Sequence, residues 1–187
     1  MERHLTKLRD LLAAATAAIQ PDYFLLPVAD GQGGQPIYQY RERVYAYELY
    51  HQLRVRWPDD WPYSLGGEVD KHGHPVVRGE FLDDTKPDLL VHVPGRMDPD
   101  LNLAVLEIKP LRIDAHNAEQ EALRHDLQKL IAFLGVGYYA GFLLVFGEPI
   151  QRVRDYAADF SEAGIDLTLV ELWHHRAPGE PAHALVW

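Results

Sequence analysis

The chain has 187 residues, of which 47% are hydrophobic and 25% charged, a composition typical of one globular domain spanning residues 1–187. No apolar run approaches the roughly 20 residues that a transmembrane helix needs, so a membrane protein is excluded. The absence of cysteine excludes disulfides and thiolate metal sites and leaves a cytoplasmic location as the default expectation. The net charge of −10 argues against a free-standing nucleic-acid binder, but not against an enzyme whose carboxylates hold divalent cations.

The first third of the chain is predicted to contain two helices. Apolar residues at helical spacing predict an amphipathic helix over residues 4–19, and the glycine- and proline-containing segment up to Gln39 is typical of a loop. A longer helix is predicted from Tyr40 to Trp57, with Glu48 in its middle. Its predicted apolar face is formed by Val44, Tyr47, His51 and Val55.

Three strands are predicted next, over residues 61–69, 88–93 and 103–109. Glu68 lies near the end of the first strand, and a predicted turn with His72 and His74 follows it. The two histidines have the spacing of metal ligands, but a turn supplies no second group of ligands. A solvated loop is therefore the favoured interpretation of this pair.

The remaining elements alternate between helix and strand. We predict a helix over residues 117–134, a strand over 138–146, a helix over 150–163 and a strand over 167–173. The order of helix, helix, three strands, helix, strand, helix and strand predicts an α/β domain with a mixed central sheet flanked by helices.

Acidic residues occur in the two central strands, where a hydrophobic sheet would not favour them. Residues two apart in a strand share a face, so Glu107 and Lys109 point to one side, and Leu106 and Ile108 to the other. If the two strands pair, Asp88 joins Glu107 and Lys109 at the same end of the sheet.

This combination of residues suits the hydrolysis of a phosphodiester. Mg²⁺ or Mn²⁺ takes oxygen ligands, and the carboxylates of Asp88 and Glu107 together with the backbone carbonyl of Ile108 would supply three. Lys109 would orient or help to deprotonate the attacking water and stabilise the transition state. Each residue also has a structural interpretation, in which Asp88 caps the start of its strand and Glu107 and Lys109 form an ion pair on one face.

Pro87-Asp88, followed nineteen residues after the aspartate by Glu107-Ile108-Lys109, resembles the signature of the PD-(D/E)XK, or restriction-endonuclease-like, nuclease superfamily. The resemblance implies a core of helix, three strands, helix and strand over about residues 40–146, with an N-terminal helix and a C-terminal helix and strand added. It implies a Mg²⁺-dependent endonuclease-type phosphodiesterase that cuts DNA rather than RNA.

The same resemblance implies roles for residues on two helices. Glu48 on the first core helix matches a glutamate that contributes to the metal site, and Gln128 or Lys129 on the second matches a residue directed at the site. Arg41 and Arg43 are candidates for phosphate contacts, although a solvated face is the favoured interpretation of this basic helix.

A second function remains open at this point. The chain could be a non-catalytic interaction module of the same fold, or a subunit of a larger nucleic-acid-processing or defence assembly. The sequence contains no recognisable DNA-binding module beyond the predicted domain, so a homodimer or a protein partner would supply target selection.

Overall fold

The structure is a computed structural model, which describes residues 1–28, 36–67, 86–96, 98, 101–111 and 116–187. The predicted turn with His72 and His74 lies outside the described residues, as does Glu68. In the part of the chain that is described, no helix is long and apolar enough to cross a membrane.

A mixed six-stranded sheet forms the centre of the molecule, with the strand order β3-β4-β5-β6-β7-β8. The strands are β3 (Ser64–Gly67), β4 (Leu89–His92), β5 (Asn102–Pro110), β6 (Ala140–Phe146), β7 (Val170–His175) and β8 (His183–Leu185). β3, β4 and β5 pair antiparallel, β5, β6 and β7 pair parallel, and β8 pairs antiparallel with β7. The predicted α/β class with a mixed central sheet is confirmed.

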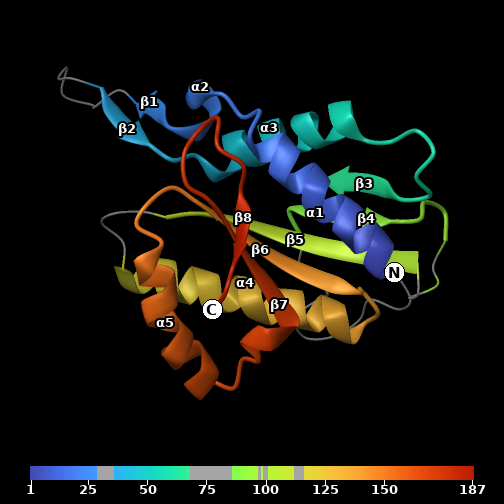
Figure 1. The fold of residues 1–187 in the computed structure, drawn as a ribbon. Coiled ribbons are helices and arrows are strands. Elements are labelled where there is room, and N and C mark those ends of the chain that lie inside the picture. Colours follow the sequence, from blue (N-terminus) through green and yellow to red (C-terminus); the bar gives the residue numbers. More distant parts are fainter. Residues whose placement is uncertain (29–35, 68–85, 97, 99–100, 112–115) are drawn as a thin grey trace.

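Helices cover both faces of this sheet (Figure 1). On one face lie α1 (Glu2–Thr16) and α3 (Glu42–Arg56), whose buried side chains share a core with Leu106 and Ile108 of β5. On the other face lie α4 (His116–Gly135) and α5 (Gln151–Glu162), which pack with Val105 in a second core. Successive side chains of β5 point into two apolar cores. A charged side chain in β5 therefore needs hydrogen-bond or ion-pair partners among the side chains that pack against it.

From α3 to β6 the element order is helix, three strands, helix and strand, as the sequence predicts for residues 40–146. Two regions differ from the prediction. The segment predicted as a loop contains α2 (Pro21–Phe24) and a separate two-stranded sheet of β1 (Leu26–Val28) and β2 (Ile37–Gln39). The strand predicted from residue 167 starts at Val170, because Leu167–Leu169 forms a 3₁₀ turn in which the Thr168 N–H donates to the Asp166 carboxylate.

The predicted apolar face of α3 is wrong. Tyr47 and Val55 are 61% and 67% exposed, and the residues that are buried instead are Tyr45, Leu49 and Leu53. The Tyr45 ring stacks on Phe146 of β6 with a centroid separation of 3.9 Å, and this contact sets the rotation of the helix. Glu48 therefore does not lie on the face that packs against the sheet.

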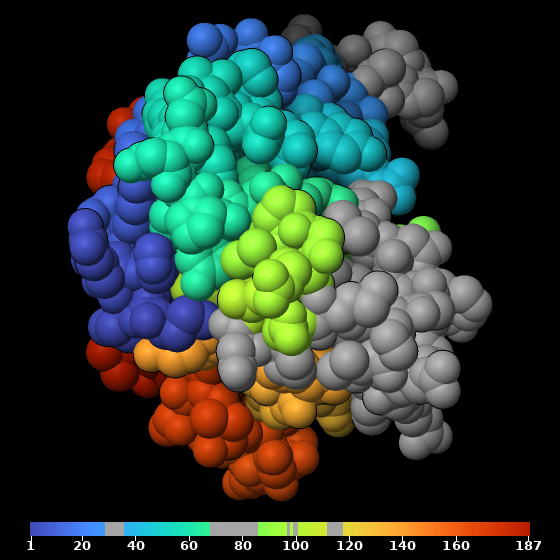
Figure 2. Space-filling model, turned by 90° about the vertical axis from the view of Figure 1, so that its right-hand side faces the viewer, coloured from blue at the N-terminus to red at the C-terminus, as the bar shows by residue number. Residues whose placement is uncertain are grey.

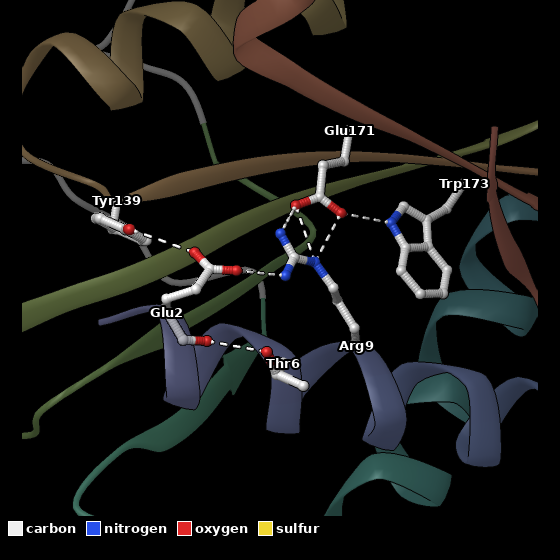
Figure 3. Close-up of polar contacts among 6 residues, drawn as sticks. All are labelled: Glu2, Thr6, Arg9, Tyr139, Glu171 and Trp173. Atoms are coloured by element: carbon white, nitrogen blue, oxygen red, sulfur yellow. Dashed lines mark hydrogen bonds and ion pairs between the residues drawn. The ribbon is translucent and has the colours of Figure 1, made fainter. Parts of the chain in front are cut away.

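An arginine fork fastens α1 to the sheet (Figure 3). Arg9 Nε and Nη2 donate to the Glu171 carboxylate of β7, at 2.7 Å for the shorter contact, and Trp173 Nε1 donates to the same carboxylate at 3.0 Å. Arg9 Nη1 also donates to Glu2 at 2.8 Å.

Seen from the right-hand side of Figure 1, α1 and α3 lie next to each other beside the turn that follows β4 (Figure 2).

Removing this fork should loosen the docking of α1. We expect Arg9→Met to lower the free energy of unfolding by about 1–3 kcal/mol, because charge-assisted hydrogen bonds to a half-buried carboxylate are lost. Urea unfolding followed by tryptophan fluorescence measures this change. Arg3→Met, on the exposed side of the same helix, is the matched control and should leave the midpoint within experimental error. Equal midpoints for both variants would contradict the role given to Arg9.

Candidate active site

The candidate site forms where the pairing of β4 with β5 stops. The last pair is Leu89 with Leu106, and β5 continues to Pro110 without β4 beside it. At this point the Ile108 N–H donates to Asp88 Oδ2 at 2.7 Å. A side-chain carboxylate thus takes the place of the backbone carbonyl that a longer β4 would have supplied.

The same hydrogen bond indicates where the Ile108 carbonyl points. In a strand, the N–H and C=O of one residue leave the backbone on the same side, because paired residues exchange both hydrogen bonds. The Ile108 N–H faces Asp88, so its carbonyl also leaves β5 on the Asp88 side. Asp88 and this carbonyl therefore belong to one side of β5.

Glu107 is the most deeply buried acid of the cluster, with 2% of its surface exposed. Its Oε2 accepts from Lys129 Nζ of α4 at 2.6 Å. Its Oε1 is buried and has no hydrogen-bond partner in the described part of the chain. A buried carboxylate oxygen without a partner is costly, so this atom is a candidate ligand for a cation.

Lys109 connects the two helical layers. Its Nζ lies 3.0 Å from Glu42 Oε2 of α3 and 3.0 Å from Asp126 Oδ2 of α4. Asp126 Oδ1 is also 3.6 Å from Lys129 Nζ, three residues further along α4. Because β4 has ended, the Lys109 side chain can reach both layers past the edge of the sheet.

The two carboxylates resist ionisation. Burial, the largest influence, and the nearby Glu42 carboxylate raise the pKa of Asp88 to about 6, although the hydrogen bond from Ile108 opposes them. Burial and then the charge of Asp88 raise the pKa of Glu107 well above its usual range, and Lys129 offsets only part of this effect. The charge of Asp88 thus disfavours the ionisation of Glu107, as expected of two acids that share a site.

The two lysines remain charged. Burial by itself would lower the pKa of Lys109, but the adjacent Asp126 and Glu42 carboxylates outweigh it and raise the pKa. The pKa of Lys129 is raised in the same way, by Glu107 first and then by Asp126, against the effect of burial. Both side chains are therefore ammonium ions at neutral pH and donate hydrogen bonds only.

The six side chains comprise four acids and two bases, and they are short of positive charge once all four acids ionise. Four carboxylates (Asp88, Glu107, Asp126 and Glu42) face the two ammonium groups of Lys109 and Lys129. One divalent cation would balance the two excess negative charges of the ionised cluster, and Glu107 Oε1 could bind it. No group of three or more His, Cys, Asp or Glu side chains in the described ranges is arranged to hold a metal, so a backbone carbonyl would have to complete such a site.

The cluster reaches the surface through a pocket of about 230 Å³. It is lined by Glu42, Arg43, Ala46, Lys86 and Asp88. Asp88 is thus accessible, whereas Glu107 lies behind it and is buried. The pocket gives an anionic ligand two cationic side chains at its entrance.

Of the residues predicted from the sequence, the structure brings Asp88, Glu107 and Lys109 together at one end of the sheet. It also brings in Lys129, whereas among the described residues its neighbour Gln128 makes none of the hydrogen bonds or ion pairs that hold the cluster. Glu48 is not brought to the cluster: its Oε1 accepts from Gln52 Nε2 of its own helix at 2.6 Å. Its place is taken by Glu42, which follows from the rotation of α3 described above.

Two residues of the cluster were not predicted, Glu42 and Asp126. Asp126 precedes Lys129 by three residues on a predicted helix, a spacing that puts both side chains on one face and is a usable signal. Glu42 could be predicted as a member of the cluster only if the apolar face of α3 were predicted correctly. Arg41 and Arg43 are both exposed at the start of that helix, and Arg43 lines the pocket with Asp88.

Comparisons of the chain with protein-family models, with curated proteins and with solved structures found no match. The chemistry of this cluster is therefore the basis for any functional conclusion.

The raised pKa of Asp88 makes the stability of the protein depend on pH. Its protonated form contributes stability that is present below its unfolded-state pKa of about 4 and is lost as the pH rises through about 6. Asp88→Asn keeps an acceptor for the Ile108 N–H but cannot ionise. At about pH 8 and without metal, we expect this variant to be more stable than the natural protein by about 1–3 kcal/mol, and the difference should vanish near pH 4.

Denaturant unfolding across this pH range measures the difference. Asp59→Asn, on the exposed surface, is the matched control and should show no such pH dependence. A variant at residue 88 that is less stable than the natural protein at high pH would contradict the assigned shift.

Proposed function

We propose that the protein is a metal-dependent nuclease that hydrolyses phosphodiester bonds, in DNA rather than RNA. The observation that carries this proposal is the position of Asp88 and Glu107 side by side, with Lys109, at the point where β4 and β5 separate. Buried acids that are short of positive charge fit a cation-dependent reaction on an anionic substrate.

The order of elements supports the same proposal. α3, β3, β4, β5, α4 and β6 follow the order that a PD-(D/E)XK core requires. The Pro-Asp pair lies directly before β4, and the Glu-Ile-Lys motif lies on β5. We therefore propose a restriction-endonuclease-like core, with α1 and the segment from α5 to β8 added to it.

Asp88, Glu107 and the backbone carbonyl of Ile108 would hold Mg²⁺ or Mn²⁺. This ligand set suits a hard cation, which takes oxygen ligands and usually keeps several waters. When bound, the cation would activate a water and offset the charge of the phosphate. Glu107 Oε1 is the ligand atom with the strongest support, because it is buried and without a hydrogen-bond partner among the described residues.

Lys109 acts as a cation rather than as a base in this proposal. Its raised pKa keeps the ammonium protonated, so it can orient the attacking water and stabilise negative charge in the transition state, but it cannot accept the proton of that water. Glu42 and Asp126 hold the ammonium from opposite sides of the sheet. Their role is to position Lys109, and Lys129 balances the charge of Glu107.

A non-catalytic interaction module is the competing function. It is favoured by the short ion pair between Glu107 and Lys129, which already supplies one cation to the buried acid. In such a module the six side chains would form a structural network, and the protein would bind no divalent cation at this place. Cleavage and metal binding distinguish the two functions.

Lys109 gives the sharpest test of cleavage. With Mg²⁺ or Mn²⁺, we expect the purified protein to cut plasmid or single-stranded DNA, and Lys109→Ala to lower the rate by a factor of at least about 100, because an electrostatic contribution to the transition state is lost. Gel electrophoresis measures the rate, and circular dichroism confirms that the variant is folded. Lys7→Ala, on α1, is the control and should cut normally. Unchanged cleavage by the Lys109 variant would exclude the assigned site.

Metal binding can be tested without activity. A cation that binds only the folded protein raises the midpoint of thermal unfolding. We expect about 10 mM Mg²⁺ to raise the midpoint of the natural protein at about pH 8, and to leave that of Asp88→Asn nearly unchanged, because one ligand and its charge are missing. An equal shift in both proteins would show that the cation binds elsewhere.

A further inference from the structure

We propose that the substrate is a single strand of DNA that lies in a groove along α3 and passes Asp88. This inference rests on the proposed nuclease function and names the form of its substrate. The groove consists of three adjoining pockets whose lining residues overlap.

The shared lining residues place the three pockets next to one another along α3. The first pocket, of about 670 Å³, lies between β1 and the start of α3 and is lined by residues that include Tyr40 and Arg41. It shares Glu42 and Arg43 with the pocket of about 230 Å³ that contains Asp88. That pocket in turn shares Ala46 and Asp88 with a third, of about 300 Å³.

One side of α3 forms the floor of this groove. Arg43, Tyr47 and Tyr50 follow one another at intervals of four and three residues, so they lie along one face of the helix. Ala46 lies between them and leaves space above the helix opposite Asp88. Tyr47 is 61% exposed, and the ring of Tyr50 lies against Gly67 at the edge of β3.

These side chains match the two parts of a nucleotide strand. Exposed aromatic rings offer surfaces on which bases stack, and arginines at the other end of the groove attract the phosphates. Arg41 and Arg43 lie at the β1 end, and Tyr47 and Tyr50 at the β3 end, with Asp88 between them. A phosphate of a strand held between the arginines and the tyrosines would lie beside Asp88, which we propose as a metal ligand.

The tyrosines favour a single strand over a duplex. In a duplex the bases stack on one another and present only their edges, so Tyr47 and Tyr50 would find no base face to contact. A single strand exposes base faces and follows a narrow groove. The acidic remainder of the molecule, with a net charge of −10, also disfavours the broad phosphate contacts that a duplex requires.

Binding can be measured separately from cleavage. The probe is a fluorescein-labelled oligothymidylate of about 20 nucleotides, longer than one site of this kind, and its duplex with oligoadenylate. Fluorescence anisotropy is recorded in EDTA and again in Ca²⁺, which takes oxygen ligands in a looser geometry than Mg²⁺. We expect the single strand to bind at least about tenfold more tightly than the duplex in one or both conditions.

Variants then locate the contact. Tyr47→Ala should weaken binding of the single strand about tenfold, because one base loses its stacking partner. Arg43→Gln should weaken it and reduce the slope of log affinity against log salt by about one. The matched controls are Tyr139→Ala, an exposed tyrosine before β6, and Arg154→Gln on α5, and both should bind normally.

The outcomes separate the groove from the nuclease function. Equal or tighter binding of the duplex, or full binding by the Tyr47 and Arg43 variants, would overturn the groove even if the protein cuts DNA. Selective single-strand binding that these variants weaken supports the groove, and if Mg²⁺ and Mn²⁺ then give no cleavage, the nuclease function alone is wrong.

Discussion

The hydrogen bond from the Ile108 N–H to the Asp88 carboxylate is the interaction on which the site depends. β4 begins one residue after Asp88, so β5 continues beyond its neighbour and needs an acceptor for its exposed N–H. The acceptor is a side chain instead of a backbone carbonyl. The use of a side-chain acceptor brings an acid beside Glu107. Because β4 ends here, Lys109 also has room to reach both helical layers.

A cluster of buried charges costs stability compared with an apolar core of the same volume. Here the cost is visible in two carboxylates whose pKa values are raised by burial, and in Glu107 Oε1, a buried oxygen without a hydrogen-bond partner among the described residues. The rest of β5 alternates between two well-packed cores. Buried acids with raised pKa values that gather at one end of a sheet are typical of functional sites.

The sequence predicts the sheet and the site to different extents. Period-two patterning is enough to place Glu107 and Lys109 on one face of β5, and proline and glycine mark most element ends. The rotation of α3 was predicted wrongly, because buried Tyr45 and exposed Tyr47 are the same residue type. Only the stacking of Tyr45 on Phe146, far away in the sequence, decides between them. With Tyr45 buried, Glu42 reaches Lys109, whereas Glu48 bonds to Gln52 of its own helix.

The two sheets of the molecule are not hydrogen-bonded to each other. β1, which lines one end of the groove along α3, belongs to the two-stranded sheet, whereas the carboxylates belong to the six-stranded one. Packing instead holds the small sheet beside α3: Phe24, at the end of α2 and before β1, packs edge-to-face against Tyr40 and Tyr45. The position of this end of the groove is therefore set by packing and by the chain that links β2 to α3, whereas strand pairing sets the position of β4 and β5, which carry the two carboxylates.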